Sequence, residues 1–121
     1  MPEIQNSKKY DLEERTYRFA SRCRDFIKKL PRTISNVEYE RQLMRSSGSQ
    51  AANYIEANES LSKKDFVHRI KICRKETKES CLWLKLCEVG KNEDSEKERQ
   101  YLLGEALELR KIFTSILNKS I

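Results

Sequence analysis

The sequence predicts an all-α protein, an antiparallel up-down-up-down four-helix bundle formed by a single domain over residues 1–121. Three observations lead to this fold. Three glycines and two prolines are too few for the frequent turns of a sandwich or barrel. Charged residues make up 36% of the chain and hydrophobic residues 37%, which is typical of helices that bury one stripe and solvate the rest. Four segments with helical periodicity, joined by short loops, pack best as such a bundle.

The first helix is expected over about residues 12–30. Asp11 can cap its start, and Glu14 stands at the N3 position of a capping box. Pro31 ends it, because the proline ring disfavours helical geometry in the residue before it. One face carries the apolar residues, which are Leu12, Phe19, Ala20, Cys23, Phe26, Ile27 and Leu30.

The second helix is expected over about residues 36–59 and begins with a capping box formed by Ser35 and Glu38. Small residues around Gly48 favour a close approach of a neighbouring helix. Its inward face is unusually polar and consists of Leu43, Ser47, Ala51, Tyr54 and Asn58.

The third helix is expected over about residues 63–89, with Ser62 as N-cap, Asp65 at N3 and Gly90 as the stop. Its core stripe is Phe66, Ile70, Cys73, Thr77, Cys81 and Leu84.

The fourth helix is expected over about residues 95–118. It faces inward with Leu102, Ala106, Leu109, Phe113 and Ile116, and the stripe is widened by Leu103, Leu107, Ile112 and Leu117.

The hydropathy of the chain and its cysteine and histidine residues predict its compartment and whether it binds a metal. No apolar run approaches the roughly 18 residues of a membrane span, and the first six residues contain no apolar signal region, so we expect a cytoplasmic chain without a membrane partner. The four cysteines form no C-x-x-C pair, and His68 is the only histidine. We therefore expect reduced thiols acting as small core hydrophobes, with no metal and no cofactor.

The formal charge of +6 is concentrated in two segments. Residues 1–34 and residues 62–90 each carry a net charge of +4, whereas residues 35–61 carry −2 and residues 91–121 carry zero. The stripe on the first helix is Arg15, Arg18, Arg22 and Lys29, and the stripe on the third helix is Lys64, Lys71, Lys75, Lys78 and Lys85.

Each stripe has two interpretations. The basic residues could contact the phosphates of a nucleic acid, releasing counterions. They could also form solvated faces with partners one turn away, as in Lys71, Lys75 and Glu79. The first and third helices lie diagonally in an up-down bundle, so only an oligomer could join the two stripes into one surface.

A second apolar strip supports a homo-oligomer. On the third helix Ile72, Trp83 and Leu86 point away from the core stripe, and Tyr17 lies off the core face of the first helix. Trp83 is the expected interface anchor. Packing at the edge of the monomer is the alternative.

Catalytic motifs are absent from the sequence, so we expect a protein that is not an enzyme. The carboxylates best placed for chemistry are Glu56, Glu76 and Glu79, but they lack the Glu-x-x-His motifs of di-metal bundles. A structural polar network is the preferred interpretation. It comprises Gln42, Arg45, Asn53 and Glu56 on the second helix with Glu76 and Glu79 on the third.

Several of these residues resemble a motif of the bacterial proteins encoded in intervening sequences of large-subunit (23S) rRNA genes. The second helix of that family reads approximately Q-L-x-R-A-x-x-S-x-x-x-N-I-A-E-G, and the matching residues are Gln42, Arg45, Ser49, Asn53 and Glu56. Residues 62–66 resemble the S-K-K-E/D-F start of its third helix, and Glu76 and Glu79 fall on its E-x-x-E pair.

The resemblance implies a closed four-helix bundle that is not an enzyme. It also implies that the relatives of this chain assemble as homopentamers. The resemblance extends to the accessory variability protein of diversity-generating retroelements, which looks like a basic pentameric ring that binds reverse transcriptase and nucleic acid.

The favoured functional prediction is a basic homo-oligomeric bundle that binds RNA or DNA backbones without strong sequence choice. No aromatic residue is expected among the basic stripes, which argues against reading of single strands. The alternative is a protein-interaction scaffold that docks an acidic partner or a polymerase such as a reverse transcriptase.

Overall fold

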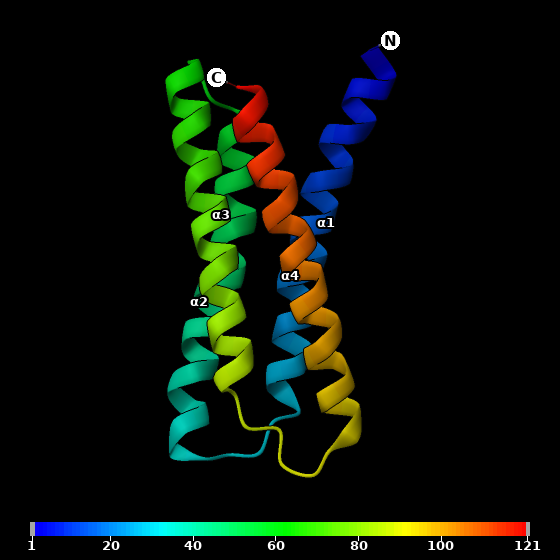
Figure 1. The fold of residues 1–121 in the computed structure, drawn as a ribbon, viewed down its shortest axis with the longest axis vertical. Coiled ribbons are helices and arrows are strands. Elements are labelled where there is room, and N and C mark those ends of the chain that lie inside the picture. The colour runs from blue at the N-terminus through cyan, green and yellow to red at the C-terminus, as the bar shows by residue number, and fades with distance from the viewer. Residues whose placement is uncertain (1, 121) are drawn as a thin grey trace.

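The computed structural model describes the backbone of residues 2–120 and the side chains of residues 11–120. Its helices are α1 (Pro2–Lys28), α2 (Ile34–Asn58), α3 (Lys63–Leu86) and α4 (Glu93–Lys119), with no strand in the described chain (Figure 1). The predicted all-α fold is therefore confirmed. The loops from α1 to α2 and from α3 to α4 lie at one end of the bundle, and the loop from α2 to α3 lies at the other (Figure 1).

The helices follow one another around the bundle in chain order. Each packs against its neighbours in sequence, and α4 closes the ring against α1. The α2–α3 pair is packed most extensively and the α1–α4 pair least. As expected, α1 lies diagonally from α3, so side chains on their outer faces cannot form one surface within a monomer.

The ends of α1 and α4 differ from the predictions. The first helix, α1, begins at Pro2, so the predicted capping box at Asp11 and Glu14 is wrong. Proline suits the first turn of a helix, because its nitrogen has no hydrogen to donate. At the start of α4, the Asn92 side chain accepts hydrogen bonds from the backbone N–H groups of Asp94 and Ser95. The helix therefore begins at Glu93 instead of residue 95.

The ends of α2 and α3 are also set by side chains. Thr33 caps α2 by accepting a bond of 3.0 Å from the backbone nitrogen of Asn36, so the capping box at Ser35 is wrong. The Ser62 cap of α3 is present, and its hydroxyl accepts from the nitrogen of Asp65 at 3.1 Å. However, α3 ends at Leu86, before Gly90, which has a φ of +66° within the following loop.

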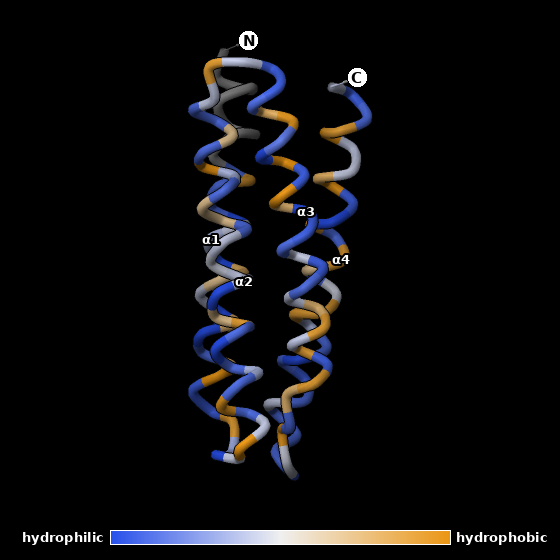
Figure 2. Tube along the Cα trace, turned by 90° about the vertical axis from the view of Figure 1, so that its left-hand side faces the viewer, coloured by the Kyte–Doolittle hydropathy of each residue, from blue (hydrophilic) through white to orange (hydrophobic). Residues whose placement is uncertain are grey.

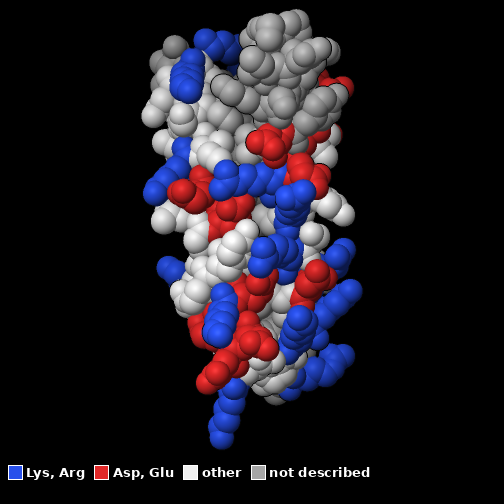
Figure 3. Space-filling view, turned by 90° about the vertical axis from the view of Figure 1, so that its right-hand side faces the viewer, with Lys and Arg blue, Asp and Glu red and all other residues white. Residues whose placement is uncertain are grey.

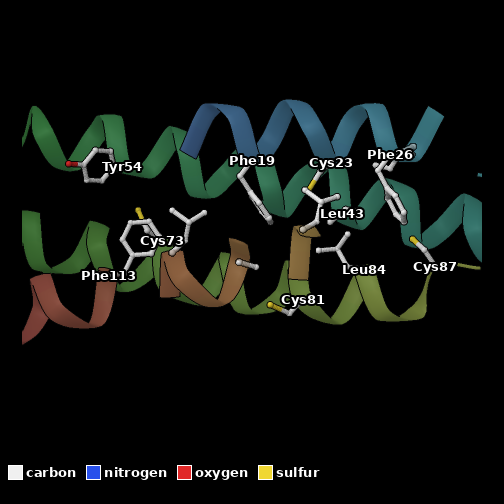
Figure 4. Packing of buried hydrophobic residues seen from close by; sticks show 14 of the residues in the cluster. Phe19, Cys23, Phe26, Leu43, Tyr54, Cys73, Cys81, Leu84, Cys87 and Phe113 are labelled. Carbon is white, nitrogen blue, oxygen red and sulfur yellow. The ribbon is translucent and has the colours of Figure 1, made fainter. Parts of the chain in front are cut away.

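The core draws on all four helices. Figure 4 shows Phe19 of α1 pointing toward Leu43 of α2 and Leu84 of α3, and Figure 2 shows apolar positions alternating with hydrophilic ones along each helix. The expected inward residues of α3 and α4 are buried except Phe66 and Ile116, which are half-buried. In α2 the expected Ala51 and Asn58 are half-buried, while the buried set also includes Asn36, Ser46, Gln50 and Ala57.

All four cysteines are free and buried. Burial raises the pKa of Cys73 to about 12 and that of Cys87 to about 11, so these thiols stay protonated and unreactive at neutral pH. The interpretation of the cysteines as small core hydrophobes is thus confirmed. Across the described residues, no group of side chains is arranged to hold a metal ion, and no helix is long and apolar enough to cross a membrane.

Candidate nucleic-acid interface

A groove of about 810 Å³ runs between the outer faces of α3 and α4. Seven of the eleven residues that line this α3–α4 groove are Lys or Arg, and none is Asp or Glu. The cationic residues are Lys71, Arg74, Lys75, Lys78, Arg110, Lys111 and Lys119, and the other four are Leu107, Thr114, Ser115 and Asn118.

Both walls of the groove carry positive charge. On α3, Lys71, Lys75 and Lys78 recur at helical spacing and are exposed. Arg74 donates to the Thr114 hydroxyl at 3.3 Å, which links the two walls. Of the seven cations, only Lys111 lies in an ion pair within the described chain, at 3.5 Å from Glu108, which does not line the groove. The positive charge of the groove is therefore largely uncompensated.

The remaining lysines predicted on α3 lie beyond the groove. Lys64 and Lys71 line a neighbouring hollow of about 490 Å³ together with Lys63 and His68. Lys85 is exposed in the last turn of α3.

The sequence prediction missed four of the seven cations of the groove, which are Arg74, Arg110, Lys111 and Lys119. The three missed cations on α4 were overlooked because the net charge of residues 91–121 is zero. All six acidic residues of that segment precede Leu109, and its last thirteen residues contain only basic charges. Dividing the helix into halves would have revealed this asymmetry.

The stripe predicted on α1 is compensated by carboxylates. Arg15 donates two hydrogen bonds to Glu105, at 2.7 and 2.9 Å, and Arg22 donates two to Glu98, at 2.9 and 2.7 Å. These bonds raise the pKa of both guanidinium groups. Figure 3 shows this side of the molecule, where acidic and basic groups alternate over α1 and α4.

The other two residues of that stripe differ from each other. Arg18 forms an exposed ion pair with Glu14 at 3.1 Å, and Lys29 is exposed. The guanidinium carbon of Arg22 lies 3.7 Å from the centre of the Tyr101 ring. The expectation that no aromatic residue lies among the basic stripes is therefore wrong.

The predicted polar strip joins α2 to α3 through Arg45. Its guanidinium lies 3.2 Å from Glu76 and 3.0 Å from Glu79, and it also donates to Gln42 at 3.4 Å. Asn53 instead accepts a bond of 2.9 Å from Arg69. Glu56 is exposed and lies outside this network.

We expect the two carboxylates to couple unequally to Arg45 in double-mutant cycles. The Glu76 side chain is 7% exposed and that of Glu79 is 38% exposed, so solvent screens the second pair more. Arg45→Ala with Glu76→Gln should give a coupling energy of about 1.5 kcal/mol. Arg45→Ala with Glu79→Gln should give about 0.5 kcal/mol. Urea unfolding measures both, and two couplings near zero would show that neither pair stabilises the fold.

The residues predicted to form an oligomer interface lie in different environments. Trp83 is half-buried against the core, with its ring centre 6.1 Å from that of Tyr39, so it packs at an edge of the monomer. Ile72 is half-buried, whereas Leu86 and Tyr17 are exposed. The prediction overlooked four exposed apolar residues on α2, which are Ile34, Val37, Met44 and Ile55.

Comparison with known proteins gives the family. The family model of the 23S rRNA-intervening sequence protein matches residues 8–115. A crystal structure at 1.70 Å resolution of a protein with unknown function, from the S23 ribosomal protein family of Bacteroides thetaiotaomicron VPI-5482, superposes with a TM-score of 0.72. The two chains are 25% identical, and the match covers 87% of this chain and 96% of the other. The comparison with curated proteins gave no match. Since the family model spans most of the chain, this chain belongs to the 23S rRNA-intervening sequence protein family.

Proposed function

We propose that this protein is a binding module, not an enzyme, and that its α3–α4 groove holds the phosphate backbone of a nucleic acid. The observation that carries this proposal is a groove lined by seven cations and no carboxylate. The lysine and arginine side chains of the groove would displace the counterions condensed on the phosphates, and this release drives binding at low salt. The family's connection with 23S rRNA makes RNA the first ligand to test.

The chemistry of the groove favours contact with the backbone over reading of sequence. Its uncharged polar residues, Thr114, Ser115 and Asn118, can add hydrogen bonds to phosphate or sugar oxygens. Its lining includes no aromatic ring on which a base could stack. Binding in the groove should therefore depend on charge and only weakly on sequence.

The same proposal includes self-association, with a pentamer as the assembly that the family resemblance implies. The exposed apolar residues Val37, Met44 and Ile55 lie on α2, which does not line the groove. Assembly through that helix would leave the groove free for a ligand. Light scattering of the purified protein measures the subunit number, and a monomer at micromolar concentration would overturn this part.

A salt titration with a fluorescent hairpin RNA tests the groove. The logarithm of the association constant should fall linearly with the logarithm of the salt concentration, with a slope of about −6 if all seven cations contact phosphates. The triple variant Lys71→Ala, Lys75→Ala, Lys78→Ala should bind roughly 10- to 100-fold more weakly at about 0.1 M salt, and its slope should be smaller by about 3.

A matched triple variant controls for the loss of three charges. Lys28, Lys91 and Lys97 are exposed and lie outside the groove, so replacing all three by alanine should leave most of the affinity and slope unchanged. Equal effects of the two triple variants would show that net charge, not the groove, drives binding. Binding that is absent at low salt would overturn the proposal. Protein partners that remain bound in a pull-down after nuclease digestion would then favour a protein-interaction scaffold.

A further inference from the structure

A second hollow, of about 410 Å³, lies on the other side of α4, where α4 meets α1. Its charge differs from that of the α3–α4 groove. Three arginines line it, Arg15, Arg18 and Arg22, together with three carboxylates, Asp11, Glu14 and Glu105. This α1–α4 hollow has no excess of positive charge, so a phosphate chain is not the ligand that its charges select.

The hollow contains a flat and fixed stacking surface. Two hydrogen bonds to Glu98 and the Tyr101 ring, 3.7 Å away, hold the planar guanidinium of Arg22 in one orientation. The Arg22 side chain remains 43% exposed, and Tyr101 is also about half exposed. Arginine planes and tyrosine rings are the surfaces on which proteins stack unpaired bases.

Polar groups beside this stacking surface suit the edge of a base. Glu105 can accept hydrogen bonds from exocyclic amino groups, and Arg15 can donate to ring nitrogens or carbonyl oxygens. The bidentate bond between these two side chains holds them both at the hollow. Phe19 adds an apolar contact to the lining. A nucleobase combines a flat apolar face with an edge of alternating donors and acceptors, and this lining complements both.

The hollow and the groove share one helix, α4, as a wall. Both are lined by α4, the hollow by Tyr101 and Glu105 and the groove by residues from Leu107 onward. Gly104 lies between them in sequence, is exposed, and has open space where a side chain would project. A strand could therefore pass over α4 from one site to the other.

We infer that the α1–α4 hollow receives one unpaired base of the nucleic acid whose backbone lies in the α3–α4 groove. This inference rests on the proposed function and adds a specificity to it. The protein then binds RNA with a bulged or looped-out nucleotide more tightly than fully paired RNA.

Two hairpin RNAs, each closed by a non-nucleotide linker so that no loop base is unpaired, and alike except for one bulged 2-aminopurine, test the inference. Wild-type protein should bind the bulged hairpin about 10-fold more tightly than the paired one and quench the 2-aminopurine fluorescence, because stacking quenches it. Tyr101→Leu should abolish the preference and the quenching while leaving the affinity for the paired hairpin and the salt slope unchanged.

The controls separate this site from the groove. Tyr17 is an exposed tyrosine on α1 that, unlike Tyr101 on α4, does not line the hollow. Tyr17→Leu should therefore keep the preference for the bulged hairpin. The triple lysine variant of the groove should weaken binding to both hairpins by the same factor. If Tyr101→Leu fails to fold, Arg22→Gln removes the stacking plane and should give the same result.

Three outcomes would count against the site, and one of them would also overturn the proposed function. Equal wild-type affinity for the two hairpins, with no quenching, would overturn the base site and leave the groove proposal standing. Loss of the preference in Tyr17→Leu as well as Tyr101→Leu would also overturn it. Failure of wild-type protein to bind either hairpin at low salt would overturn the proposed function and this inference together.

Discussion

Replacing Asn36 by alanine should lower the free energy of unfolding by about 3 kcal/mol. Asn36 is fully buried, and its side chain joins the two loops at one end of the bundle. Its amide nitrogen donates to the carbonyl oxygens of Pro31 and Glu88, each at 2.9 Å. Its carbonyl oxygen accepts from the backbone nitrogen of Glu88 at 2.8 Å. Alanine would leave these backbone groups without the partner that the side chain supplies.

Urea unfolding followed by far-UV circular dichroism measures this loss. Ser35→Ala is the matched control, because Ser35 is the adjacent residue and is only half-buried. It should change the free energy of unfolding by less than about 0.5 kcal/mol. Losses of equal size in the two variants would show that the bonds of Asn36 contribute nothing specific.

Replacing Arg99 by methionine should cost a similar amount, about 3 kcal/mol. The Arg99 side chain is 13% exposed, and one guanidinium nitrogen donates to the backbone carbonyls of Leu84, Lys85 and Cys87. The last carbonyls of a helix have no partner within it, and a positive charge there also interacts favourably with the helix dipole. Methionine keeps much of the apolar volume and removes these bonds.

The loss should be localised to the end of α3. Hydrogen exchange should show faster exchange in its last turn and in the loop that follows, with little change at Ser62, where α3 begins. Arg99→Lys keeps the charge but cannot hold three carbonyls at once, so its effect should be intermediate. Lys97→Met, at an exposed position of the same helix, is the control and should stay within about 0.5 kcal/mol. Unchanged exchange in Arg99→Met would contradict this role.

Local signals in the sequence were sufficient for the helices and for much of the core. Five of the six residues predicted for the core stripe of α3 are buried, and Phe66 is half-buried. The Ser62 cap was found at its predicted place. The alternation of apolar and polar residues is imposed on each helix separately, so it can be read without knowledge of the partner.

Helix ends were predicted less well, because neighbouring residues compete for the cap position and because a residue of another helix binds the last turn of α3. The Ser35 capping box had the required residue types, yet Thr33 is the cap and Asn36 turns toward Glu88, 52 residues away. Similarly, α3 ends at Leu86, before Gly90, where Arg99 of the next helix binds the carbonyls of Leu84 and Lys85. A cap supplied from another helix leaves no local pattern.

For the candidate sites, the sequence determined which residues are charged and which helix faces they occupy. It placed Lys71, Lys75 and Lys78 on one face, and the structure forms a groove from that face together with Arg110, Lys111 and Lys119 of α4. Only the tertiary structure decided which cations are paired. Arg15 meets Glu105 and Arg22 meets Glu98 across 90 and 76 residues, whereas the groove lysines meet no carboxylate among its lining residues. The physical reason is that helical periodicity fixes the direction of a side chain on its own helix, while the charge it meets depends on which helix packs beside it and in what register.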